Sequence, residues 1–130
     1  MQHNWTNLSK RTLTILASLV CVTSAMAASE NDLVRGRDTF DKRCTGCHAL
    51  DKIKVGPPLR GVYGRHAGKD PQFEYSDAVK NASVTWDAST LDRWLTDTES
   101  VIPGNDMAFR LNDPSDRANI IAYLRQVAGK

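Results

Sequence analysis

The sequence lacks several features that would place it in a specialised class of protein. Among its 130 residues are only 3 cysteines, and there is no low-complexity tract and no convincing internal repeat. The mostly apolar segment at residues 13–22 is shorter than the roughly 20 residues that span a bilayer. These absences disfavour a repeat protein and a membrane-spanning protein. The length favours a single domain of ordinary globular composition.

Residues 1–27 have the three-part pattern of a secretory signal. The first eleven residues are polar and include Lys10 and Arg11 but no acidic residue, and a mostly apolar run follows. Ala25-Met26-Ala27 then supplies the small residues that a signal peptidase reads. We expect cleavage after Ala27, export to the periplasm and a mature domain of residues 28–130. A membrane anchor that stays attached is the alternative interpretation.

Removal of this segment changes the charge balance of the chain. Lysine plus arginine falls from 17 to 15 and matches the 15 acidic residues, so the mature polypeptide has a formal charge near zero. No basic stripe is left, which argues against nucleic acid as a partner. The mature chain keeps two cysteines, Cys44 and Cys47, and a single methionine, Met107.

The two remaining cysteines form the motif Cys44-Thr45-Gly46-Cys47-His48. C-x-x-C-H is the attachment pattern for haem c, in which each thiol adds to one vinyl group and the histidine binds the iron. A thioredoxin-like pair would follow a β-strand, and no strand pattern precedes Cys44. A structural zinc site would need four ligands, usually two such pairs. The motif therefore predicts one covalently bound haem.

The iron of such a haem needs a second axial ligand or an open site. Met107 lies in Ile102-Pro103-Gly104-Asn105-Asp106-Met107, where turn-forming residues predict a loop. A methionine in such a loop, far from His48 in sequence, is suited to close over the opposite haem face. Its soft sulfur favours ferrous iron. His66 and an open site are the alternatives, although His66 is most simply a polar loop residue.

The sequence pattern predicts an all-α domain with long loops. Helical spacing predicts a first helix over residues 31–43, which leads to the cysteines. Glycine and proline predict loop for most of residues 49–75, followed by one or two short helical turns within 76–81. Asp87 predicts the start of a helix over 88–97, and Asp113-Pro114 predicts the start of a last helix that ends near 128.

These motifs resemble those of the class I cytochromes c, which include mitochondrial cytochrome c and its soluble bacterial relatives. The resemblance covers nearly all of residues 33–127. It rests on Cys44–His48, Gly56-Pro57-Pro58-Leu59-x-Gly61, Gly64-Arg65, Tyr75-Ser76-Asp77-Ala78, Thr85-Trp86, Ile102-Pro103-Gly104-Asn105-Asp106-Met107-x-Phe109 and Arg117-x-x-Ile120-Ile121-x-Tyr123-Leu124. It implies the cytochrome c fold, in which three main helices, short helical turns and long loops surround one haem c.

The resemblance also implies roles for single residues. The carbonyl of Pro57 is expected to accept a hydrogen bond from His48, and Arg65, Tyr75 and Trp86 are expected to bind a haem propionate. On their own, these residues would be a turn proline, a surface arginine and core aromatics. Gly36 and Phe40 are expected to pack against Tyr123 on the last helix.

The chain departs from the family pattern at three positions around Met107. Trp94 stands where a tyrosine often touches the methionine sulfur, and Thr98 replaces a common proline. Asp106 replaces the lysine of mitochondrial forms. Because the formal charge of the mature polypeptide is near zero, the strongly basic docking face of mitochondrial forms is not expected.

The resemblance implies a periplasmic single-electron carrier of a respiratory or photosynthetic-type chain, and not an enzyme. Its iron would alternate between Fe(III) and Fe(II) with His48 and Met107 bound. A cytochrome reductase, oxidase or dehydrogenase would dock transiently at the haem edge of a monomer. The alternatives are a dedicated cytochrome subunit of a larger oxidoreductase, or a haem peroxidase or small-ligand-binding protein, which would need Met107 off the iron.

Overall fold

The computed structural model describes Met1 and residues 28–129, so the rest of the predicted export signal lies outside the described residues. Its helices are α1 (Glu30–Arg43), α2 (Asp77–Lys80), α3 (Ala88–Thr96), α4 (Thr98–Val101) and α5 (Pro114–Ala128). Within the described part of the chain, the only extended pairing is an isolated bridge between His66 and Thr85. The prediction of an all-α domain with three main helices is confirmed.

Polar side chains fix where the three main helices begin. Ser29 and Asp32 form a capping box at α1, because each side chain binds the other residue's backbone N–H. Asp87 and Thr90 do the same at α3. The carboxylate of Asp113 accepts hydrogen bonds from two backbone N–H groups of the first turn of α5, with proline as its first residue. The predicted starts at Asp87 and Asp113 are therefore confirmed.

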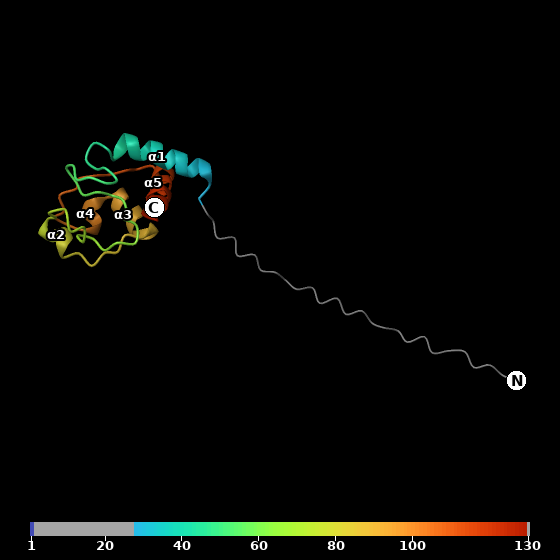
Figure 1. Cartoon of the computed structure of the whole chain (residues 1–130). Coiled ribbons are helices and arrows are strands. Elements are labelled where there is room, and N and C mark those ends of the chain that lie inside the picture. The colour runs from blue at the N-terminus through green and yellow to red at the C-terminus, as the bar shows by residue number, and fades with distance from the viewer. Residues whose placement is uncertain (2–27, 130) are drawn as a thin grey trace.

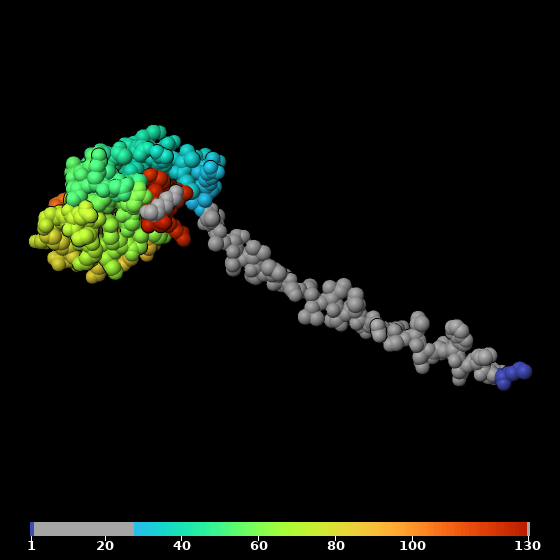
Figure 2. All heavy atoms as spheres, in the orientation of Figure 1, coloured from blue at the N-terminus to red at the C-terminus, as the bar shows by residue number. Residues whose placement is uncertain are grey.

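The long loop between α1 and α2 makes up a large part of the domain. Residues 49–75 contain no helix, in line with the predicted loop, and α2 forms one of the one or two short turns expected within residues 76–81. Figure 2 shows these loop residues, coloured green to yellow-green, covering the face between α1 and α2. The four-residue helix α4 was not predicted, because a single turn is too short to show a helical period.

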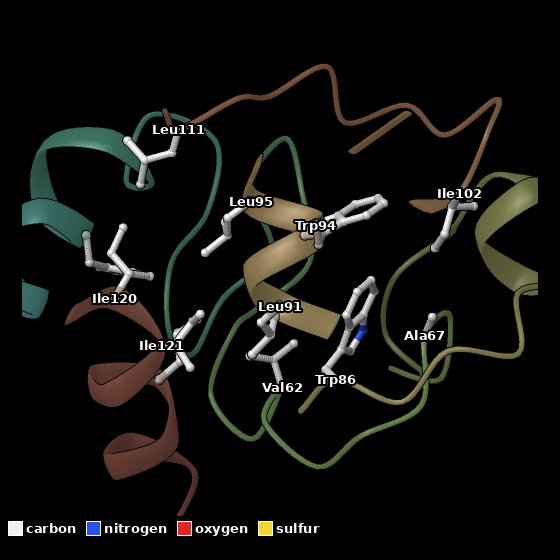
Figure 3. Packing of buried hydrophobic residues seen from close by; sticks show 12 residues of the cluster. Val62, Ala67, Trp86, Leu91, Trp94, Leu95, Ile102, Leu111, Ile120 and Ile121 are labelled. Atoms are coloured by element: carbon white, nitrogen blue, oxygen red, sulfur yellow. The ribbon is translucent and has the colours of Figure 1, made fainter. Parts of the chain in front are cut away.

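The helices pack in two groups around one apolar core. Helix α1 lies against α5, while α3 contacts both α4 and α5, and Figure 1 shows α2, α3 and α4 to one side of the α1–α5 pair. The rings of Phe40 on α1 and Tyr123 on α5 are 5.4 Å apart, which confirms the predicted contact between the first and last helices. Figure 3 shows Leu91 and Leu95 of α3 facing Ile121 of α5. None of the helices in the described residues is both long and apolar enough to cross a bilayer.

Candidate functional site

The end of α1 sets the positions of the two cysteines. The backbone N–H of Cys44 still donates to Phe40 on the helix, whereas Cys47 and His48 donate to the carbonyl of Cys44 at 3.1 and 2.8 Å. This tight turn directly follows the helix. Burial raises the pKa of the Cys44 thiol to about 11, whereas Cys47 is exposed. Both cysteines lie on the short turn that ends at His48.

The imidazole of His48 is buried and held in one orientation. Its Nδ1 donates to the carbonyl oxygen of Pro57 at 2.9 Å, which is the bond that the resemblance implied. Since a carbonyl can only accept, Nδ1 carries the proton and Nε2 keeps its lone pair for a metal. Burial also lowers the pKa of His48, which favours the neutral ring that binds iron.

Gly56 leaves the space that the His48 ring fills. A Cβ atom at this position would collide with Cε1 of His48 and would lie 2.8 Å from its Nδ1. The backbone N–H of Gly56 also donates to the carbonyl of Cys47 at 2.8 Å, so the glycine cannot easily move away. The absence of a side chain at position 56 is therefore part of how the site is built.

Replacing Gly56 with alanine is expected to displace the imidazole from the Pro57 carbonyl. We expect the holoprotein to lose about 2 kcal/mol of unfolding free energy, because overpacking of this kind costs 1–3 kcal/mol. Urea unfolding of the purified ferric protein measures the change. The matched control is Val55→Ala, since the neighbouring Val55 is 77% exposed and its truncation should alter stability by less than about 0.5 kcal/mol. Equal stabilities for the two variants would contradict the steric role of Gly56.

The loop that carries Met107 is held at both peptide groups of that residue. Its N–H donates to Oδ1 of Asn105 at 2.8 Å, and its carbonyl accepts from the hydroxyl of Thr98 at 2.5 Å. The side chain of Met107 is partly buried and packs against the apolar core. His66, the alternative axial ligand, is exposed and its Nδ1 lies 3.0 Å from the hydroxyl of Thr85.

The three residues that the resemblance assigned to a propionate lie in one region. Trp86 donates its backbone N–H to the carbonyl of Arg65 at 2.9 Å. The guanidinium of Arg65 forms a salt bridge of 3.2 Å with Asp70. The pKa of Tyr75 is raised, mainly because the side chain is partly buried. The positive charge of Arg65 opposes this rise in the pKa. Their contact with a propionate stays a prediction.

Two further features of this region were not assigned from the sequence. The hydroxyl of Ser76 is buried and is the only such side-chain oxygen or nitrogen without a partner in the described residues. It adjoins Tyr75, and a carboxylate oxygen of a bound group would satisfy it. Trp86 packs on Trp94 with ring centroids 5.1 Å apart, and Figure 3 shows these two rings side by side. Trp94, which stands where the family often has a tyrosine, therefore belongs to the apolar core.

Comparison with known proteins decides the family. Residues 33–128 match the sequence profile described as cytochrome c. The chain belongs to the cytochrome c family. A cytochrome c2 of Rhodomicrobium vannielii is 44% identical over 118 residues, which cover 88% of this chain and 92% of that protein. A cytochrome c of Chlamydomonas reinhardtii is 44% identical over 103 residues, covering 76% of this chain and 92% of that protein.

The same family is found among solved structures. Cytochrome cH from Methylobacterium extorquens superimposes with a TM-score of 0.70 at 39% identity, covering 73% of this chain and 98% of that one. Because sequence and fold agree, the cofactor is a covalently bound haem c. The chain is an electron carrier of the cytochrome c2 type and not an enzyme, and its redox partners bind transiently.

The residues at the site fit such a group. A cytochrome c supplies a haem with two cysteine thiols and a neutral histidine, and here Cys44, Cys47 and His48 lie on one turn with the imidazole oriented by Pro57. The unpartnered hydroxyl of Ser76 is a further donor for a buried carboxylate. The family assignment and the local geometry therefore agree.

Proposed function

We propose that this cytochrome c is an exported single-electron carrier with its haem attached at Cys44 and Cys47 and its iron bound by His48 and Met107. When bound, haem c supplies a one-electron couple between Fe(III) and Fe(II). Arg65, Tyr75, Ser76 and Trp86 would bind the propionates. The observation that carries the proposal is the orientation of His48, whose Nδ1 is bonded to Pro57 and whose Nε2 is left to bind a metal.

Among the residues outside the proposed signal, Met107 is the one best suited to be the second axial ligand. It is the single methionine outside the proposed signal, and its sulfur is a soft donor that stabilises ferrous iron and raises the reduction potential. The hydrogen bonds from Thr98 and to Asn105 hold its backbone. A methionine that is held in place lowers the reorganisation energy of each electron transfer, because the ligand does not have to move.

The exposed edge beside Cys47 supports transient docking of a redox partner. The loop at residues 51–55 is exposed and closes onto Cys47 through the bond from Gly56 N–H at 2.8 Å. Ile53 and Val55 are 45% and 77% exposed, with Lys52 and Lys54 beside them. A small apolar contact with a few charges around it is typical of weak redox complexes. A reductase, oxidase or dehydrogenase of a respiratory or photosynthetic-type chain would dock here.

Expression of the full chain in a bacterium with the haem-attachment machinery tests the proposal. We expect the periplasmic fraction to contain a protein that starts at residue 28 by mass spectrometry and carries one haem. Its reduced form should have the absorption band of a c-type haem, and its ferric form the weak far-red band of a methionine–iron bond. A protein that retains residues 1–27 would contradict processing, and a ferric spectrum without the far-red band would contradict ligation by Met107.

Gel filtration of the native periplasm separates a free carrier from a subunit. A free carrier elutes at the size of a monomer of about 100 residues. Co-elution of all the haem protein with a larger oxidoreductase would instead establish the dedicated-subunit alternative.

A further inference from the structure

Thr98 is a buried polar residue beside the loop that carries Met107. It is the first residue of α4, and only 2% of it is exposed. Its hydroxyl donates to the carbonyl oxygen of Met107 at 2.5 Å and accepts from the backbone N–H of Phe109 at 3.5 Å. One side chain thus contacts the peptide groups that follow Met107 on the inner side of the loop.

Other contacts hold the same loop. The carboxylate of Glu99 accepts from the backbone N–H of Gly104 at 3.0 Å, and Nδ2 of Asn105 donates to the carbonyl of Ile102 at 2.8 Å. Asn105 also accepts from the N–H of Met107. Thr98 is buried and its bond to Met107 is partly buried, whereas the bonds to Glu99 are exposed. Because water competes less with a buried hydrogen bond, Thr98 contributes more to holding Met107 than Glu99 does.

The backbone at position 98 does not itself require threonine. The first position of a helix suits proline, which lacks an N–H that would be unpaired there. Asp97, the preceding residue, has an extended backbone with φ −162° and ψ 105°, close to the region that a residue before proline adopts and outside the helical region that proline disfavours there. Proline is therefore compatible with the start of α4. What threonine adds is the hydroxyl that reaches Met107.

We propose that Thr98 is a positioning residue that holds Met107 on the haem iron and thereby limits the access of external ligands to the iron. The inference rests on the proposed ligation by Met107. An external ligand binds only to the fraction of molecules in which the methionine is off the iron, so its apparent affinity reports how firmly the loop is held. Loss of this hydrogen bond should raise that fraction about three- to tenfold.

Imidazole titration of the ferric holoprotein tests this role. Thr98→Val keeps the shape of the side chain without the hydroxyl. In this variant we expect imidazole to displace Met107 and abolish the far-red band, with an apparent affinity for imidazole about three- to tenfold higher than in the wild type. Thr98→Ser should restore the affinity to near the wild-type value, because it keeps the hydroxyl. Thr98→Pro should behave like the valine variant with the start of α4 preserved.

A matched control separates this role from a general loss of stability. Thr90→Val removes a hydroxyl that caps α3 and donates to the carbonyl of Thr85 at 2.6 Å, away from the Met107 loop. It should lower the urea midpoint of unfolding without changing the affinity for imidazole. If Thr98→Val and Thr98→Pro also unfold earlier but bind imidazole as the wild type does, Thr98 is merely structural and the proposal is overturned.

Failure of the underlying ligation would look different. If Met107 is not the iron ligand, the wild-type protein lacks the far-red band and binds imidazole as tightly as Met107→Ala does. If Met107 is the ligand and Thr98 has no positioning role, the far-red band is present in the wild type and the Thr98 variants all titrate alike. The two outcomes are therefore distinguishable in one set of titrations.

Discussion

Replacing Met107 with alanine is expected to abolish the far-red band of the ferric protein while haem attachment and binding of His48 persist. The alanine side chain has no donor atom, so the sixth position becomes available to water or an added ligand. We also expect the reduction potential to fall by a sizeable part of the roughly 0.8 V range that axial ligands span, because the sulfur that stabilises ferrous iron is lost. Optical spectra and a potentiometric titration measure both effects.

The neighbouring Asp106 supplies the control for Met107. Asp106 is exposed and lies in the same loop, so Asp106→Ala should keep the far-red band and titrate at nearly the wild-type potential. Added imidazole should bind tightly to Met107→Ala and weakly to Asp106→Ala. A far-red band that persists in Met107→Ala would exclude this methionine as the ligand. A wild-type protein without the band, whose ferric spectrum changes in His66→Ala, would implicate the alternative residue.

Replacing Gly36 with alanine is expected to lower the unfolding free energy by about 3 kcal/mol. In most helices the change from glycine to alanine stabilises by about 1 kcal/mol. Here an added Cβ would overlap the carbonyl oxygen of Asn119 on α5 and would lie 2.7 Å from its carbonyl carbon. Backbone atoms cannot rotate out of the way, so α1 and α5 would have to separate.

Urea unfolding of the ferric holoprotein measures this loss of stability. The matched control is Val34→Ala on the same helix, because Val34 is 56% exposed and its truncation should cost less than about 0.5 kcal/mol. The spectrum of Gly36→Ala should remain that of the wild type below the unfolding transition, since the residue lies away from the proposed ligands. A stability equal to or above that of the wild type would show that α1 and α5 do not meet at Gly36.

The main helices could be predicted because their signals are local. Asp87 and Asp113 are side chains that bind backbone N–H groups within the next three residues, so the sequence alone places the starts of α3 and α5. The apolar stripe of α5 can likewise be predicted, because its apolar residues recur at helical spacing in the sequence. Helix α4 has a single turn, and its start depends on Asp97 accepting from Glu99 N–H. Such a short element leaves no period to read.

The candidate site also has a part that the sequence predicts and a part that it does not. C-x-x-C-H lies within five consecutive residues, so its spacing alone predicted haem attachment. The resemblance also anticipated the bond from His48 to Pro57, and the structure confirmed it. The sequence did not assign a role to the buried hydroxyl of Ser76, because nothing in its local pattern shows that the hydroxyl is left without a partner.

The sequence by itself determined that this chain has a haem attachment motif, a single methionine outside the predicted signal and three main helices, two of them with a recognisable capping residue. Tertiary structure alone decided that Gly36 meets Asn119, that Gly56 makes room for the His48 ring and that Thr98 holds the carbonyl of Met107. The physical reason is the reach of each interaction. Caps and motifs act within one turn of chain, whereas steric fit and buried hydrogen bonds depend on segments that only folding brings together.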